Sequence, residues 1–511
     1  MEPGVLTCDI TLDPAFTIAP VPPRLFGSFV EHMGRCVYGG IYEPGHAESD
    51  VDGLRLDVMK LVRELGVSVV RYPGGNFVSG YEWEDGVGPV QQRPSRLDLA
   101  WRSIEPNTFG LNEFMSWADA AQVEPMMAVN LGTRGVQEAI DLLEYCSVRG
   151  GTARSDQRRA NGAADPYHVP VWCLGNELDG PWQLGHKTAT EYGRLAAETA
   201  RAMRMVDPDL TLVACGSSGS GMPTFGAWER TVLTEAYDEV DLVSAHAYYC
   251  EEDGDLGSFL ASAVDMDRVV AAVTATADAV RAERRATKRI HLSFDEWNVW
   301  YIHAQASKPP TGDDWPVAPP LLEDHYTVAD SVVVGNLLVS LLRNTDRVHA
   351  ACQAQLVNVL APIMTEPGGR AWRQTTFHPF ALTSRYASGQ VLRGTIDVPT
   401  YPTSRFGDVP LVDAVATHDE ERAELVVLVV NRSTDASTRF EADLRAFRAA
   451  RLVEALTLSD PDPHRQAQPD DDGATAPRPN GTAAVVDGRL EVDLPPVSWS
   501  ILRVALAGQG A

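Results

Sequence analysis

The sequence predicts an α/β fold, a (β/α)8 TIM barrel, followed by a C-terminal antiparallel β-sandwich domain. The chain has 511 residues, which is too long for one ordinary domain. Its first two thirds alternate short apolar runs with helical patterns, and from about Ser388 the pattern becomes β-like. We therefore expect an N-terminal strand in residues 1–18, the barrel in residues 19–387 and the sandwich in residues 388–511.

Eight apolar runs are the predicted barrel strands. They are continuously apolar rather than alternating, which is typical of parallel strands buried on both faces. A doubly wound open sheet is the alternative, but it rarely needs eight units, and no G-x-G-x-x-G follows the first run. The runs begin at Leu25, Val67, Glu124, Val169, Leu210, Val240, Arg289 and Ala351.

Helical patterns separate these runs, and two of them end at clear stop signals, Gly66 and Asp207-Pro208. The predicted helices begin near Leu54, Gly110, Gly135, Lys187, Asp265 and Tyr326.

Beyond Ser388, β-like runs such as "AELVVLVVNRS" are separated by Gly, Pro and Asp, which predicts a sandwich. The N-terminal "GVLTCDITLD" alternates like a strand, and we expect it to join that sandwich.

Composition excludes several classes of function. The formal net charge of −27 disfavours binding to nucleic acid or to anionic lipid. No apolar run approaches the roughly 20 residues of a membrane span, and "MEPGVLTCDITLDP" lacks a secretory signal. The seven cysteines are scattered singly, which favours a reduced, cytoplasmic compartment. Without H-E-x-x-H or a Walker motif, we expect no metal or cofactor.

Polar residues end most of the apolar runs. In a (β/α)8 barrel the carboxyl ends of the strands meet at one mouth, so these side chains should form a ring there. The ring comprises Glu31, Arg71, Asn76, Asn130, Asn176, Glu177, His246, Tyr248, Asp295, Glu296, Gln355 and Asn358.

Glu177 and Glu296 end the fourth and seventh runs and form the candidate catalytic pair. Glycoside hydrolysis needs two such carboxyl groups, one to protonate the leaving oxygen and one to attack or to activate water. Taken singly, a glutamate at a strand end is more often structural, Arg71 an ion-pair partner, and His246 a core residue. Two glutamates within a polar ring favour catalysis.

The motifs "FGSFVEHMGRCVYGGIYEPGH", "RYPGGNFVSGYEWEDGVGP", "RPSRLDLAWRSIEPNTFGLNEF", "WCLGNELDGPWQLGHK", "SFDEWNVWY" and "AQLVNVLAPIMT" occur in this order along the chain. Together they closely resemble the α-L-arabinofuranosidases of glycoside hydrolase family 51. The resemblance implies an exo-acting, retaining hydrolase with Glu177 as acid/base and Glu296 as nucleophile. Their carboxyl groups should then lie about 5–5.5 Å apart.

The resemblance also implies roles for further residues. Glu31, Asn76, Asn176 and Gln355 match residues that bind the furanose hydroxyls; Arg71 and Tyr248 match residues that flank the nucleophile; His246 shares the motif of Tyr248; Trp101 and Trp182 match aromatic residues at the mouth. An arabinofuranosyl oligosaccharide substrate and a homo-oligomer, often a hexamer, are implied as well.

Two departures from the family pattern are visible. Leu178 replaces a common methionine, which should be tolerated. The acidic, Pro-rich segment 308–324 leaves the leaving-group preference open. Two alternatives remain at this point: a retaining hydrolase of another neutral sugar, a β-xyloside or β-glucan, and a non-catalytic sugar-binding protein.

Overall fold

The computed structural model describes residues 6–304 and 307–507. A closed barrel of eight strands confirms the predicted TIM barrel, and every pairing between neighbouring strands of the barrel is parallel. All eight predicted runs supply one strand each. They are β3 (Arg24–Phe29), β4 (Val69–Tyr72), β7 (Glu124–Ala128), β8 (Val171–Leu174), β9 (Thr211–Ala214), β10 (Leu242–Tyr249), β11 (His291–Val299) and β12 (Val348–Gln353).

The six predicted helices are present: α1 (Leu56–Leu65), α2 (Leu111–Ala121), α3 (Val136–Ser147), α5 (Ala189–Val206), α8 (Ala263–Arg284) and α9 (Val328–Arg343). Gly66 ends α1 in the left-handed region, at φ 77°, where a glycine is favoured. Within residues 6–304 and 307–507, four α-helices were not predicted: α4 (Ala153–Ala160), α6 (Ala227–Ala236), α7 (Leu256–Leu260) and α10 (Phe377–Tyr386). Three short 3-10 helices were not predicted either: η1 (Asn76–Gly80), η2 (Trp83–Gly86) and η3 (Val90–Gln92). Among the described residues, no helix is both long enough and apolar enough to cross a membrane.

Two sheets form the C-terminal sandwich. One contains β16 (Thr395–Asp397), β1 (Leu6–Thr11), β21 (Thr438–Asp443), β25 (Arg489–Leu494) and β24 (Ala484–Val486), in that order. The other contains β2 (Thr17–Pro20), β15 (Gln390–Leu392), β19 (Val412–Asp419), β20 (Glu424–Asn431), β26 (Ser498–Ala505), β22 (Arg451–Leu458) and β23 (Arg478–Pro479). The remaining strands in the described part of the chain form three two-stranded sheets. These are β5 (Arg96–Asp98) with β6 (Ser103–Glu105), β13 (Ile363–Thr365) with β14 (Ala371–Arg373), and β17 (Thr400–Thr403) with β18 (Gly407–Pro410).

The N-terminal strand β1 lies in the sandwich sheet, between β16 and β21. It pairs antiparallel with β16 but parallel with β21, so the sandwich is not wholly antiparallel. We propose domain boundaries between residues 18 and 19 and between residues 387 and 388. The position of β1 in the sandwich supports this division, although β2 extends across the first boundary. Residues 1–5 and 508–511 of that division lie outside the described residues.

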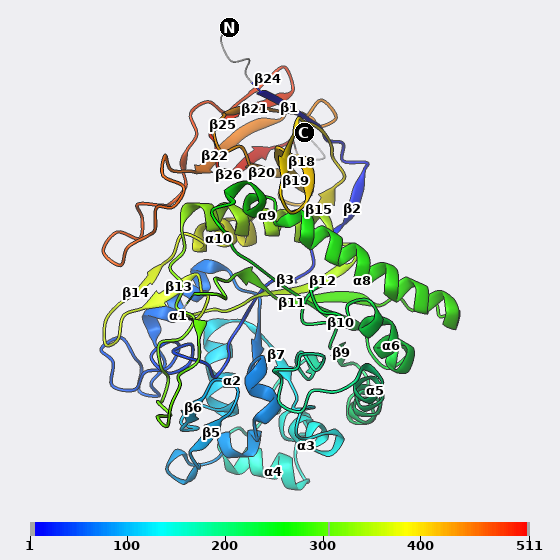
Figure 1. Ribbon diagram of the computed structural model, residues 1–511, viewed down its shortest axis with the longest axis vertical. Helices are drawn as coiled ribbons and strands as arrows, with labels where there is room; N and C mark the ends of the chain where they lie inside the picture. The colour runs from blue at the N-terminus through cyan, green and yellow to red at the C-terminus, as the bar shows by residue number, and fades with distance from the viewer. Residues whose placement is uncertain (1–5, 305–306, 508–511) are drawn as a thin grey trace.

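Helix α9 lies between the barrel and the sandwich, as Figure 1 shows, and it contacts β19, β20 and β26. Its residues 328–342 are all buried, which explains why the helix is apolar on every side. Gly335 permits this close approach, because a Cβ there would lie 2.2 Å from the ring of Trp499.

A buried ion-pair network ties α9 to the sandwich. The Asp413 carboxylate of β19 accepts hydrogen bonds from Arg343 (2.7 Å) and Asn336 (2.8 Å) of α9, and from Arg432 (2.7 Å). Burial alone would raise the pKa of Asp413, but the two guanidinium groups hold it well below its usual value.

Replacing this carboxylate tests the network. Asp413→Ala should lower the free energy of unfolding by about 3–5 kcal/mol, because Arg432 stays buried without its partner. The folded pKa of Asp413 lies below its unfolded value, so its stabilisation is present above the unfolded pKa and is lost as pH falls through the folded one. Denaturant unfolding at neutral and at acidic pH should therefore show a difference from the wild type that shrinks on acidification. The exposed Asp408→Ala is the control, and an equal loss in both variants would contradict the prediction.

Candidate active site

A cavity of about 650 Å³ opens at the carboxyl ends of the barrel strands. Most of the predicted site residues line it: Glu31, Asn76, Trp101, Glu177, Trp182, His246, Tyr248, Glu296 and Gln355. The other two, Arg71 and Asn176, are buried and hydrogen-bonded to one another and to the lining residues.

The two candidate catalytic glutamates lie close together although they are far apart in the sequence. Glu177 follows β8 and Glu296 lies in β11. Three atoms all lie within 4.8 Å of one another: a carboxylate oxygen of Glu177, a carboxylate oxygen of Glu296 and a ring nitrogen of His246. Glu177 has a positive φ of 44°, which is uncommon for a residue other than glycine and typical of functional sites.

Both oxygens of Glu296 accept hydrogen bonds. Arg71 donates to Oε1 at 2.8 Å and the Tyr248 hydroxyl donates to Oε2 at 2.7 Å. The second terminal nitrogen of Arg71 donates to Asn176 Oδ1 at 2.6 Å. These contacts fix the orientation of Glu296.

Glu177 has a different environment. Its Oε1 lies 2.8 Å from His246 Nδ1, and its Oε2 accepts a hydrogen bond from the Trp182 indole at 3.0 Å. Burial raises the pKa of Glu177, and the negative charge of Glu296 raises it further. The hydrogen bonds from His246 and Trp182 oppose this rise without cancelling it. The two glutamates therefore differ in their environment, because the pKa of Glu177 is raised whereas Glu296 binds the Arg71 guanidinium.

His246 links the pair to a third carboxylate. Its Nε2 lies 3.0 Å from Asp295 Oδ1, while Asp295 Oδ2 lies 3.8 Å from Arg71 Nε. Burial lowers the pKa of His246, but the charges of Glu296, Asp295 and Glu177 more than compensate and raise it well above its usual value. The carboxylates around the imidazole therefore favour its protonated form.

Asp295 belongs to the predicted ring of polar residues but was not predicted as a site residue. Strand alternation would place Asp295 and Glu296 on opposite faces. The pairing of β10 with β11 shifts register between Ser244 and His246, and such bulges re-aim side chains. This irregularity brings both carboxylates into contact with His246, and the sequence pattern does not reveal it.

Glu31 also lines the cavity. Its Oε1 accepts hydrogen bonds from the Phe77 amide and the Trp101 indole, both at 2.9 Å, and its Oε2 accepts one from Gln355 at 3.1 Å. Burial raises the pKa of Glu31 to about 7. Asn76 lies beside Asn176, with 3.4 Å between their amide groups.

Among the residues that the structure describes, two of the predicted ring, Asn130 and Asn358, neither line the cavity nor form a hydrogen bond with a side chain that lines it. Asn130 closes a turn through Thr133, and Asn358 binds the backbone of Thr365. Conversely, the loop Ser218–Gly221 lines the cavity. Arg405, which follows β17 in the C-terminal part of the chain, lines it too. Their sequences carry no catalytic signal, and only the fold brings them to the mouth.

Comparison with known proteins agrees with this geometry. Residues 61–266 match the model of the α-L-arabinofuranosidase 1 domain, and residues 295–498 match that of the α-L-arabinofuranosidase C-terminal domain. The chain is 56% identical to the intracellular exo-α-(1→5)-L-arabinofuranosidase of Streptomyces lividans, over 98% of this chain and 75% of that one. It is 54% identical to the exo-α-(1→6)-L-arabinofuranosidase of Bifidobacterium longum, over 98% of both chains.

The chain belongs to the family 51 α-L-arabinofuranosidases. A solved structure of this family from Bifidobacterium longum has a TM-score of 0.94 at 48% identity, covering 98% of this chain and 99% of that one. The arabinose complex of the α-L-arabinofuranosidase from Thermotoga maritima has a TM-score of 0.86 at 32% identity, covering 98% and 100%. Membership of the family agrees with the resemblance of the sequence motifs.

Proposed function

We propose that this chain is a retaining, exo-acting glycoside hydrolase. It would release terminal, non-reducing α-L-arabinofuranosyl residues from arabino-oligosaccharides or arabinose-containing polysaccharides. The observation that carries the proposal is the pair of buried carboxylates, Glu177 and Glu296, with oxygens within 4.8 Å of one another at the cavity. The exo-arabinofuranosidase names of the relatives from Streptomyces lividans and Bifidobacterium longum support the choice of sugar.

In the first step, Glu296 attacks the anomeric carbon of the arabinofuranosyl unit while Glu177 gives its proton to the departing glycosidic oxygen. The carbon–oxygen bond to the leaving group breaks, and an ester between the sugar and Glu296 forms. Burial supports this role of Glu177, because it keeps the proton on that carboxyl group at higher pH. Arg71 and Tyr248 orient Glu296 for this attack.

In the second step, Glu177 takes a proton from water, which attacks the anomeric carbon and displaces Glu296. Formation of the ester has removed the negative charge of Glu296, which had raised the pKa of Glu177. The pKa of Glu177 therefore falls, and its carboxyl group is ionised when it must act as a base. The short separation supports retention, because inverting enzymes need about 6.5–9.5 Å to hold a water molecule between the two groups.

The remaining site residues would recognise the sugar. Glu31, Asn76, Asn176 and Gln355 offer carboxylate and amide groups suited to the furanose hydroxyls. Trp101 and Trp182 offer aromatic faces at the mouth, where Trp182 is 54% exposed. Pro309 and Leu322, at the two ends of segment 308–324, line the cavity, which supports a role of this segment in leaving-group preference.

We also propose a cytoplasmic location and a homo-oligomer, with a hexamer as the expected form. The first is supported by the intracellular names of relatives from Streptomyces lividans and Bacillus subtilis. The second rests on the family resemblance alone, and sedimentation of the purified protein would measure it.

Replacing each catalytic glutamate tests the mechanism. Glu296→Ala and Glu177→Ala should each lower kcat on an aryl arabinofuranoside on the order of 10³-fold or more. With an activated leaving group, azide should restore turnover to Glu177→Ala and give an arabinosyl azide of retained configuration, because the anion attacks the ester at Glu296 without needing a base. In Glu296→Ala any azide product should have inverted configuration, because no ester with the enzyme forms. Glu235→Ala, on the exposed face of α6, is the control. Full activity of Glu296→Ala would refute the proposal.

The pH dependence of kcat/KM tests the proton donor. Because the pKa of Glu177 is raised, activity should persist above the usual range of glutamate and fall on the alkaline side as Glu177 loses its proton. In Glu177→Ala, measured with an activated aryl substrate, this alkaline fall should disappear. An unchanged alkaline limb in the variant would assign that limb to another group.

A panel of substrates tests the sugar and the linkage. Aryl α-L-arabinofuranoside should be cleaved, and aryl β-xyloside and β-glucoside should not. Oligosaccharides with (1→5) and (1→6) links, compared at equal concentration, would show which linkage is preferred. Activity on the β-xyloside alone would favour the other neutral-sugar hypothesis, and tight arabinose binding without turnover would favour a non-catalytic sugar-binding protein.

A further inference from the structure

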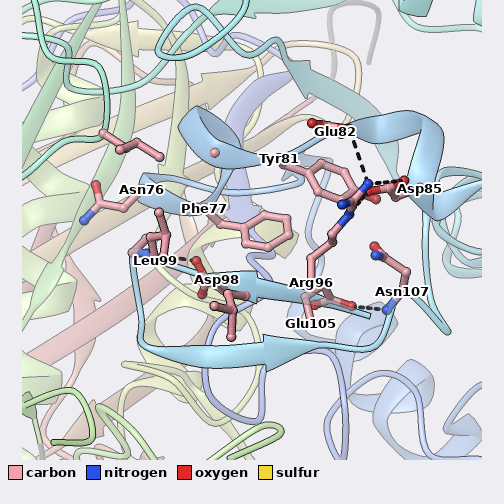
Figure 2. Close-up of a pocket in the computed structure, with 14 residues that line it drawn as sticks. Asn76, Phe77, Tyr81, Glu82, Asp85, Arg96, Asp98, Leu99, Glu105 and Asn107 are labelled. Atoms are coloured by element: carbon pink, nitrogen blue, oxygen red, sulfur yellow. Dashed lines mark hydrogen bonds and ion pairs between the residues drawn. The ribbon is translucent and has the colours of Figure 1, made fainter. Parts of the chain in front are cut away.

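The β5–β6 hairpin carries Trp101 into the active-site cavity. Trp101 lies in the turn between the two strands, and its indole donates a hydrogen bond to Glu31 at 2.9 Å. The hairpin also borders a second cavity, of about 140 Å³, whose lining includes Phe77 and Tyr81. Figure 2 shows this second cavity, with Asp98 and Leu99 of the hairpin on one side and Asn76 beside them.

One buried carboxylate holds the turn of this hairpin. Asp98 Oδ1 accepts a hydrogen bond from the Ala100 amide at 3.0 Å, and Oδ2 accepts one from the Trp101 amide at 3.3 Å. The Ser103 hydroxyl lies 3.4 Å from the same Oδ2. An aspartate that binds the amides two and three residues further on fixes the backbone of a turn. Asp98 therefore fixes the backbone at Trp101, and with it the position from which the indole extends.

We propose that Asp98 is a positioning residue, which holds Trp101 in its place against Glu31 for binding of the terminal sugar. This inference rests on the proposed function, because it takes Trp101 to contact substrate. Asp98 itself borders the second cavity and not the catalytic one, so it acts only through the turn.

The effect of Asp98 on the free energy of unfolding argues against a purely stabilising role. Within residues 6–304 and 307–507, no lysine, arginine or histidine forms an ion pair with this carboxylate. Burial raises the pKa of Asp98 to about 7, and Glu105 nearby raises it too. A carboxyl group whose folded pKa exceeds its unfolded one makes the fold less stable as pH rises from the unfolded value to the folded value. At pH 8 the ionised Asp98 thus costs stability.

Other contacts should keep the hairpin folded when Asp98 is changed. The Arg102 guanidinium lies over the Trp315 ring, 4.7 Å from its centre. The Ile104 amide donates a hydrogen bond to the Pro316 carbonyl at 3.1 Å. These contacts anchor the hairpin to segment 308–324, so a change at Asp98 should affect mainly the turn.

Steady-state kinetics of turn variants on an aryl arabinofuranoside test the proposal. Asp98→Ala should raise KM about tenfold with kcat nearly unchanged, because it weakens binding in ground state and transition state alike. Asp98→Asn keeps one acceptor oxygen and should give an intermediate KM. In a Trp101→Phe background, Asp98→Ala should raise KM little further, because both changes disturb the contact between Trp101 and Glu31. Fully additive effects on KM would overturn the proposal.

Two further measurements separate positioning from stability. The melting temperature of Asp98→Asn at pH 8 should equal or exceed that of the wild type, and a lower value with unchanged KM would show a structural role. Asp85→Asn is the matched control, because Asp85 borders the same cavity but binds Arg96 and not the turn. It should leave KM unchanged.

A fluorescence measurement keeps the proposal testable if the wild type does not cleave arabinofuranosides. The difference in emission between each protein and its Trp101→Phe counterpart isolates the Trp101 signal. Acrylamide should quench that signal more strongly in Asp98→Ala than in the wild type, because the indole leaves Glu31. Equal quenching would overturn the positioning role, whereas absence of turnover in the wild type would overturn only the proposed function.

Discussion

Charge balance around Arg71 and His246 is the constraint on which the active site depends. Glu177, Asp295 and Glu296 are buried in contact with these two groups, and carboxylates so close cannot all stay ionised without cations between them. Arg71 binds Glu296 directly, whereas Glu177 receives only the shared imidazole and an indole. Two residues of the same type thus have different environments, and the pKa of Glu177 is raised.

The barrel could be predicted because its strands are buried on both faces and leave continuous apolar runs. Helices were harder to predict where they lack that signal. Helix α4, "ARSDQRRA", is mostly polar, and α6 depends on the Glu229 carboxylate, which accepts hydrogen bonds from the Gly226 and Ser217 amides. The latter contact joins residues twelve positions apart, so a local pattern does not contain it.

The part of the candidate site that could be predicted from the sequence lies near the carboxyl ends of the barrel strands. Glu177 and Glu296 could be chosen as candidates because the carboxyl ends of barrel strands converge at one mouth, independently of the loop sequences. Asp295 was predicted only as a member of the polar ring, because strand alternation does not reveal the register shift that brings it to His246. Arg405 was missed because a hairpin outside the barrel reaches the cavity. Irregular pairing and contacts between distant segments are set by tertiary packing, which a single sequence does not display.

The position of β1 also constrains how the chain can be made. Leu6 pairs with Thr438, so β1 must wait after its synthesis until its distant partner β21 has been made. At about 5–20 residues per second, that wait lasts roughly 20–90 seconds on the ribosome. The barrel can form during this time, but the five-stranded sheet cannot. Assembly of this sheet therefore follows synthesis of most of the barrel, and the exposed edge of β1 would be open to chaperones until β21 has left the ribosome.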